Sequence, residues 1–379
     1  MKILHIVDYL MPSKGYQEFL FPRDLSDLNI ENVILTSDRY TNLKNYDVTW
    51  KQDLGQRIIG SSMIYIGNLK IIRNRTFFEY KNRILISNIL AVIKSEQPDI
   101  IFIHGSVSLN YFYIMLFLAK QRDQTIVVDN HVLFQHTNGK PLYAKLFYFI
   151  VRCFNWLFSK KVKYYFGVEK DCCRQLVRYE GISPFKVRHL SLGYSSNALD
   201  LNLSGISEIE KILKLDDNYK LIQTGKLSQD KNPLLTLQAF QEISKTRDNI
   251  SLYFFGKGSE LQNLQNYTKV NSILNVYFFD PIPSEYVPQL LSLFDLLIIP
   301  EGSSLSVYEA YSVNVRSVFN SLQVNLDRQN CGLCVCFDGS VANLVEVILT
   351  CINDRSTIPT STKKYSYHNI GRSFLNYLK

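Results

Sequence analysis

The chain has 379 residues, more than one hydrophobic core usually organises, so two domains are expected. Hydrophobic residues make up 46 % and charged residues 20 %, which excludes a disordered or fibrous protein. The net charge of +8 favours an anionic partner, but the basic residues are spread thinly and form no recognisable nucleic-acid-binding signature, so nucleic acid is not expected.

The apolar segments give no sign of export or of a membrane span. A predicted strand begins within two residues of Met1, which leaves no room for a secretory signal. The longest apolar stretch, residues 142–158, is interrupted by Lys145, Arg152 and Asn155. We therefore expect a cytoplasmic protein.

The cysteine pattern argues against both disulfides and a metal. Seven cysteines are an odd number, and Cys172 and Cys173 are neighbours, which does not fit a disulfide framework. The cluster Cys331, Cys334 and Cys336 lacks a second ligand pair at zinc-finger spacing. We expect buried free thiols and no metal site.

The first half of the chain alternates short apolar runs with amphipathic segments, which predicts a parallel sheet covered by helices on both faces. Its expected strands are residues 2–10, 32–38, 99–105, 125–130, 163–169 and 187–193.

The same alternation restarts after a polar stretch, residues 199–217. The expected strands of this second series are residues 219–225, 249–256, 275–280, 295–300, 316–320 and 332–337. The fold class is therefore α/β, with two doubly wound Rossmann-like domains. Asn232 followed by Pro233 predicts a capped helix start, and residues 367–379 predict one more amphipathic helix.

Ligands bind beyond the carboxyl ends of parallel strands, so the residues that follow each strand are the candidates for a site. Lys226 and Lys231 follow the strand at 219–225, and two ammonium groups there would neutralise a diphosphate. A solvated loop with two exposed lysines is the competing interpretation. Gly256 follows the next strand and would let the backbone approach a ligand, although such a glycine is often only a turn.

The segment from Glu301 to Glu309 follows the strand at 295–300. Its turn leads into a helix predicted near Leu305, whose free N–H groups suit an anion. Glu309 would accept hydrogen bonds from a ribose diol, and Glu301 would reach sugar hydroxyls. An ordinary helix start with two acids remains the alternative. The candidate ligand-binding positions in this turn are Gly302, Ser303, Ser304 and Leu305.

Two further candidates lie in the first half. Gly15 permits a tight turn after the first strand, and His131 follows the strand at 125–130, where it could hydrogen-bond a sugar hydroxyl or phosphate. A lone histidine in a loop is usually an ordinary surface residue, and His104 and His136 are weighed in the same way.

The order of these segments resembles the large retaining GT-B glycosyltransferase family with a Glu-x7-Glu motif, that is, glycosyl transferases group 1 of the family 4 type. The resemblance rests on GKLSQDKN at 225–232, FFGKGSE at 254–260, NVYFFD at 275–280 and LLIIPEGSSLSVYEA at 296–310. It extends backward to MPSKGYQE at 11–18, VDNH at 128–131 and residues 164–195.

The resemblance implies a GT-B fold with domains at 1–195 and 196–360 facing a central cleft, and a C-terminal helix at 361–379 that crosses back to the first domain. It implies that Lys226 and Lys231 bind the donor diphosphate, Glu309 the ribose and Glu301 the sugar. Gly15 and His131 would close from the first domain, with Glu301, His131 and Lys231 as the catalytic groups. The resemblance implies a UDP- or GDP-sugar donor and a same-face substitution in which the leaving phosphate helps to deprotonate the acceptor, so no cofactor or metal is required.

This chain also departs from the family pattern. Lys226 stands where arginine is common, Asn314 and Arg316 where a glycine and a proline are usual, Asp280 where a glycine is usual, and Ser195 where aspartate is frequent. These departures put the identity of the donor in doubt more than catalysis.

The acceptor is expected to be a polysaccharide or lipid-linked glycan of the cell envelope. Basic and aromatic residues gather at 74–83 and 142–166, which would suit an anionic membrane surface, although a buried helix explains much of 142–158 equally well. Two alternative functions remain open: a nucleotide-sugar epimerase or hydrolase, and a non-catalytic scaffold of a glycan-assembly complex.

Overall fold

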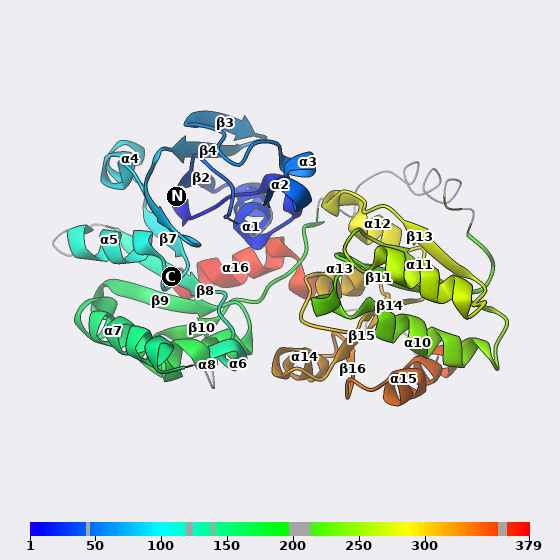
Figure 1. Ribbon diagram of the computed structural model, residues 1–379. Helices are drawn as coiled ribbons and strands as arrows, with labels where there is room; N and C mark the ends of the chain where they lie inside the picture. Colours follow the sequence, from blue (N-terminus) through cyan, green and yellow to red (C-terminus); the bar gives the residue numbers. More distant parts are fainter. Residues whose placement is uncertain (43–45, 119–123, 138–140, 197–212, 214, 355–361) are drawn as a thin grey trace. The chain divides into compact units, whose positions relative to one another are not determined.

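The computed structural model describes residues 1–42, 46–118, 124–137, 141–196, 213, 215–354 and 362–379. It forms two compact units: Met1–Leu192 together with Ile370–Lys379, and Gly193–Asn369 (Figure 1). Each unit holds a mainly parallel sheet with helices, so the expected α/β class with two doubly wound Rossmann-like domains is confirmed. Most of the polar stretch 199–217 lies outside the described residues.

The main sheet of the first unit has eight strands. In spatial order they are β10 (Val187–His189), β9 (Val162–Gly167), β8 (Thr125–Asn130), β7 (Ile100–His104), β1 (Lys2–Val7), β2 (Glu31–Ser37), β4 (Leu69–Asn74) and β3 (Ser62–Ile66). Only β3 pairs antiparallel, and β5 (Thr76–Tyr80) and β6 (Arg83–Ile86) form a separate hairpin. The chain order reverses between β1 and β7, so the ends of these two strands form the switch point where ligands bind in doubly wound sheets.

Helices surround this sheet because their apolar residues pack on its buried β-branched and aromatic faces. They are α1 (Gln17–Leu25), α2 (Tyr46–Thr49), α3 (Lys51–Leu54), α4 (Ile89–Glu96), α5 (Leu109–Phe117), α6 (Phe134–Thr137), α7 (Leu142–Phe158) and α8 (Lys170–Arg178). Short 3-10 turns are η1 (Pro12–Lys14), η2 (Ser26–Leu28), η4 (Ser159–Lys161) and η5 (Pro184–Lys186).

The last helix, α16 (Tyr367–Leu378), starts in the second unit and completes the first. Phe374 is fully buried and its ring lies 5.3 Å from Phe102 and 5.5 Å from Phe166. Gly371 allows close packing, because a Cβ there would lie 2.7 Å from Leu25. The helix is therefore part of the aromatic core of the first unit.

The sheet of the second unit is entirely parallel, in the order β13 (Val276–Phe279), β12 (Ile250–Phe255), β11 (Tyr219–Thr224), β14 (Leu296–Ile299), β15 (Arg316–Asn320) and β16 (Val335–Phe337). This is the dinucleotide-fold strand order, with its switch point between β11 and β14. The helices are α10 (Pro233–Ser244), α11 (Leu261–Val270), α12 (Val287–Leu291), α13 (Ser306–Ser312), α14 (Gln323–Gln329) and α15 (Val341–Asn353), with η7 (Gln229–Lys231), η8 (Ser284–Tyr286) and η9 (Thr362–Tyr365).

Two local expectations need correction. The segment 62–86 contains β3 to β6, which the apolar pattern did not indicate. Asn232 does precede α10, but its side chain makes no capping hydrogen bond; the residue adopts a left-handed φ of 45° instead.

All seven cysteines are free thiols. Within the described residues, no helix combines the length and apolar character needed to cross a membrane.

Candidate functional site

The candidate residues of the second unit lie at its switch point. β11 pairs directly with β14, with Leu221 opposite Leu296. The loop 225–232 leaves β11 and the loop 300–305 leaves β14, so their residues meet at one edge of the sheet. The strand order thus brings together the lysine loop and the two-glutamate segment, which lie about 70 residues apart in the sequence.

Lys231 points at the turn that follows β14. A Cβ built on Gly302 would lie 3.0 Å from Nζ of Lys231, so the ammonium group sits against the backbone of that turn. Among the described residues, the ammonium group of Lys231 has no hydrogen-bond or ion-pair partner, although its backbone N–H donates to the carbonyl of Ser228 at 2.8 Å. Lys226 is exposed. The pKa of Asp230 lies below its ordinary value because the hydroxyl of Ser228 donates a hydrogen bond to it and because the charges of Lys226 and Lys231 lie nearby. An anion entering here would find two cations without strong competitors.

Gly256 has a structural explanation. A Cβ on Gly256 would lie 1.8 Å from the carbonyl oxygen of Gly225, and one on Gly258 would lie 2.0 Å from that of Leu227. The N–H of Leu227 also donates to the carbonyl of Lys257 at 3.0 Å. The glycines therefore let the lysine loop pack directly on the loop after β12, a close approach of backbone to backbone.

A polar network that the sequence analysis missed supports the turn after β14. Asn320 donates to Oε1 of Glu301 at 2.8 Å. Fully buried Asn325 donates to the carbonyl of Gly302 and to that of Asn320, both at 3.0 Å. Nη1 of Arg328 donates to the carbonyl of Ser304 at 3.2 Å. The network fixes the backbone of the turn and the orientation of Glu301.

The helix after this turn begins where the sequence predicted. Leu305 is the N-cap of α13, and the hydroxyl oxygen of Ser304 accepts from the N–H of Ser306 at 3.2 Å. One of the expected free N–H groups is therefore already satisfied within the turn. Ser303 lies in the same turn and is partly buried.

Glu309 lies in the first turn of α13 and is partly buried. Burial raises the pKa of its carboxyl to about 7. No hydrogen bond to its carboxylate occurs within the described residues. A carboxyl that is desolvated and unpaired gains most from a ligand that donates hydrogen bonds, such as a diol.

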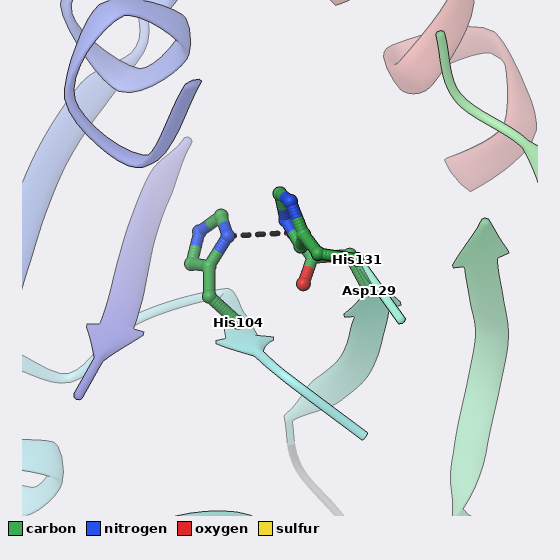
Figure 2. A group of neighbouring side chains, drawn as sticks. All are labelled: His104, Asp129 and His131. Atoms are coloured by element: carbon green, nitrogen blue, oxygen red, sulfur yellow. Dashed lines mark hydrogen bonds and ion pairs between the residues drawn. The ribbon is translucent and has the colours of Figure 1, made fainter. Parts of the chain in front are cut away.

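Three histidines of the first unit, His5, His104 and His131, form one hydrogen-bonded chain with Asp129 at the other switch point. Nδ1 of His104 lies 2.6 Å from Oδ2 of Asp129, because these residues are register partners on β7 and β8. Nε2 of His131 lies 3.3 Å from the same oxygen. Figure 2 shows the three side chains His104, Asp129 and His131 close together. On the other side, Nε2 of His104 lies 3.0 Å from Nδ1 of His5, which is held by Asn32 at 3.2 Å.

The charges in this chain favour a protonated His131. Burial would lower the pKa of His131, but the carboxylates of Asp129, Glu18 and Glu169 outweigh it and raise the pKa to about 9. Burial would likewise raise the pKa of Asp129, and the neighbouring His104 and His131 hold it below its ordinary value. His131 thus offers a positive, partly exposed hydrogen-bond donor.

His104, Asp129 and His131 also form a group of metal-ligand type, since their ligand atoms all lie within 4.8 Å. Two ligands of one ion with bonds of about 2.1 Å at a tetrahedral angle would be about 3.4 Å apart. The 2.6 Å between His104 and Asp129 fits a strong hydrogen bond better.

The other candidates of the first unit differ in their burial and in their backbone conformation. His104 is buried and belongs to the hydrogen-bonded chain of histidines. This corrects its treatment as an ordinary surface histidine. His136 is exposed on α6. Gly15 ends η1 with a φ of 65°, the left-handed conformation expected of a tight turn.

Comparisons with known proteins bear on the family and on the fold. Residues 206–367 match the family model of glycosyl transferases group 1. A search of curated proteins found none that matches the chain. Among solved structures, a glycosyltransferase from Rickettsia africae aligns with a TM-score of 0.69 at 13 % identity, covering 100 % of this chain and 98 % of the other.

Two further solved structures share the fold. HepE from Anabaena, in complex with UDP, aligns with a TM-score of 0.70 at 14 % identity, covering 100 % of this chain and 99 % of the other. UDP-GlcNAc 2-epimerase from Neisseria meningitidis, bound to UDP-GlcNAc, aligns at 0.61 and 16 %, with the same coverage. The family match over residues 206–367, together with the shared fold, supports the expectation that the protein is a glycosyltransferase enzyme.

Proposed function

We propose that the protein transfers a sugar from a nucleoside-diphosphate sugar to a glycan acceptor. The observation that carries this proposal is the unpaired Lys231 ammonium lying against Gly302 at the switch point between β11 and β14. A cation held there by a short loop would neutralise a diphosphate leaving group. Support comes from the group 1 match and from neighbours of the same fold in complex with UDP and UDP-sugars.

Each site residue has a role in this proposal. Lys226 and Lys231 bind the diphosphate, Glu309 accepts hydrogen bonds from the ribose diol, and Glu301 accepts them from the sugar. Gly302, Ser303, Ser304 and Leu305 supply backbone contacts around the donor. In this proposal His131 and Gly15 of the first unit also contact the donor, and His131 acts as a hydrogen-bond donor.

The chemistry that we infer needs no metal and proceeds with retention. The bond from the anomeric carbon to the phosphate oxygen breaks, and the acceptor oxygen forms its bond on the same face. The acceptor proton passes to the leaving phosphate oxygen. We further propose UDP or GDP as the nucleotide and a polysaccharide or lipid-linked glycan of the cell envelope as the acceptor. We also propose that the enzyme is cytoplasmic and acts at the inner face of the membrane.

A thermal-shift screen across nucleoside diphosphates and their sugars tests the donor site. We expect at least one of them to raise the melting temperature of the parent, and Lys231→Ala and Glu309→Ala to abolish the rise while remaining folded. Lys269→Ala removes an exposed lysine of α11 and should respond like the parent. If the two site variants also respond like the parent, the donor binds elsewhere.

The same fold occurs in nucleotide-sugar epimerases, which keeps an epimerase or hydrolase as the second candidate. Product analysis after incubation with the stabilising donor separates the candidates. An epimerised or hydrolysed donor, with no glycoside formed on any acceptor, would favour the second. Absence of stabilisation by every nucleotide in the screen would favour a non-catalytic scaffold.

A further inference from the structure

Helix α7 carries an apolar stripe that faces solvent. Seven large hydrophobic side chains along the helix are exposed, among them Trp156 at 78 % and Phe149 at 62 %. They recur at helical spacing along one side, with exposed Cys153 between them, and are Leu142, Tyr143, Leu146, Phe149, Ile150, Trp156 and Leu157. Monomeric proteins seldom expose contiguous apolar surface of this kind unless it meets a partner or a membrane.

The opposite side of α7 packs against the first unit through hydrogen bonds and aromatic contacts, so the exposed stripe is not the face that contacts the core. Buried Asn155 accepts from the hydroxyl of Tyr111 at 2.8 Å and donates to the carbonyl of Glu180 at 2.9 Å. The ring of Phe154 packs on Phe112 of α5 at 4.8 Å. These contacts fix the rotation of α7 about its axis and leave the stripe outward.

The end of α7 is also held in place. Nζ of Lys186 donates to the carbonyls of Ser159 and Val162 at 2.7 Å, just beyond the helix. α5, which contacts α7 through the Phe112–Phe154 ring pair, adds exposed Leu116 and Phe117 near its own end. With 17 residues, α7 is about 25 Å long, and together the two helices present an elongated apolar surface.

The acidic and basic residues in the stretch of sequence that contains α7 carry charge of one sign. Residues 130–168 contain no aspartate or glutamate. They contain six basic residues, namely Lys140, Lys145, Arg152, Lys160, Lys161 and Lys163. Lys145, Lys160 and Lys161 are exposed beside the stripe. A second copy of the chain would bring these like charges together, whereas an anionic lipid surface would attract all of them.

We propose that α7 lies flat in the headgroup region of an anionic bilayer, with its exposed apolar stripe inserted and its lysines on the lipid phosphates. Tryptophan and tyrosine beside aliphatic residues suit this interface, where one end of the ring is apolar and the other is wet. The binding deepens the proposed function by placing the enzyme where a lipid-linked acceptor lies. It is measurable without any nucleotide, so the two proposals can fail separately.

Vesicle co-sedimentation at low salt tests the docking surface. Vesicles of phosphatidylcholine with about 30 % phosphatidylglycerol should bind the parent, and pure phosphatidylcholine vesicles should bind it far more weakly. The variant Phe149→Gln with Trp156→Gln should bind at least about tenfold more weakly, because two large apolar groups no longer leave water. Raising the salt to about 0.5 M should weaken the binding of the parent by screening.

A matched control uses apolar residues that are equally exposed elsewhere. Val270 and Leu274 of the second unit are 83 % and 76 % exposed, and Val270→Gln with Leu274→Gln should bind like the parent. A second control, Met63→Gln with Tyr65→Gln, alters exposed apolar residues of β3, which is an edge strand of the eight-stranded sheet in the first unit. All variants should keep the same far-ultraviolet circular dichroism.

Tryptophan emission gives a direct signature. The chain has two tryptophans, Trp50 and Trp156, so in the variant Trp50→Phe all tryptophan emission comes from Trp156 on α7. Anionic vesicles should shift this emission to the blue, and brominated lipid should quench it. Absence of binding by the parent, equal binding by the α7 variant, or loss of binding only in the β3 variant would each overturn the proposal. A parent dimer that the α7 variant converts to a monomer, with no vesicle binding, would assign the stripe to self-association instead.

Discussion

The ammonium nitrogen of Lys231 lies beside the α-carbon of Gly302, so close that a methyl group on that glycine would be 3.0 Å from the nitrogen. The two residues belong to loops that leave neighbouring strands of one sheet. Gly302 also has a φ of 85°, in the left-handed region that disfavours a side chain. The position of the lysine head therefore depends on the absence of a side chain at residue 302.

We predict that Gly302→Ala abolishes stabilisation by nucleotides, because the methyl group displaces the lysine head from the proposed diphosphate position. Its backbone strain should cost about 1–2 kcal/mol in the free energy of unfolding. Gly332→Ala is the matched control, since that residue has a φ of 74° and open space around its Cβ position. The control should lose similar stability and keep the nucleotide response, measured by thermal shift and calorimetry. A normal response in Gly302→Ala would separate the lysine from the donor site.

Glu309→Gln should stabilise the protein at alkaline pH and leave it unchanged in acid. The pKa of Glu309 is about 7 in the folded protein against an ordinary 4.5, so the folded state takes up a proton between these values. Its contribution to stability is present below pH 4.5 and is lost as the pH rises through 7.

At pH above 7, the glutamine variant should be more stable by about 1–2 kcal/mol, less than the full shift implies because the side chain is partly exposed. Chemical denaturation across the pH range measures this difference. Glu346→Gln, which alters an exposed acid of α15, should show no such trend. A stability difference that persists unchanged in acid would show that the carboxyl of Glu309 is not desolvated.

The strands were predictable wherever an apolar run is buried on both faces, as at 219–224 and 250–255. β3 was missed because it is exposed on both faces at the sheet edge, so its apolar residues carry no burial pattern. Asn314 illustrates a substitution that structure explains: it adopts a φ of 60°, a conformation that glycine takes freely and asparagine tolerates well. A single sequence shows the replacement without showing the backbone that permits it.

The site was predictable in part for a topological reason. Lys231 and Glu301 lie in the loops that follow strands, and the doubly wound order places such loops at one edge. Asn325 lies on α14 and reaches the turn only through the tertiary fold, so no local pattern marks it. His104 was undervalued for a similar reason, since its partnership with Asp129 arises from the register of two strands.

Asp129→Asn should lower the pKa of His131. The carboxylate oxygen lies 3.3 Å from Nε2 of His131 and is the strongest influence that raises its pKa to about 9. Nuclear magnetic resonance titration of the imidazole should show a decrease of roughly one unit or more. The stability that His131 contributes, present below pH 6.5 and lost as the pH rises through 9, should shrink accordingly.

Glu18→Gln provides the graded comparison for this titration. Glu18 is farther away, at 3.9 Å, and its side chain is 28 % exposed, so solvent screens its charge. The decrease in the pKa of His131 should be smaller than in Asp129→Asn. Equal effects, or none in either variant, would contradict the assignment of Asp129 as the main partner of His131.

Asn325→Ala should weaken nucleotide binding although residue 325 has no proposed contact with the ligand. Its amide donates to the carbonyls of Gly302 and Asn320 and to the side-chain oxygen of Asn320 at 2.9 Å. Removing it leaves buried acceptors unpaired, at a cost of about 1–3 kcal/mol in the free energy of unfolding. It also releases the turn against which Lys231 rests. Calorimetry well below the melting temperature should therefore show a weaker dissociation constant, whereas Asn271→Ala, which alters an exposed amide of the same unit, should not. A lower melting temperature with unchanged affinity would mean that Asn325 supports the core alone and that the turn holds its shape through Arg328 and Asn320.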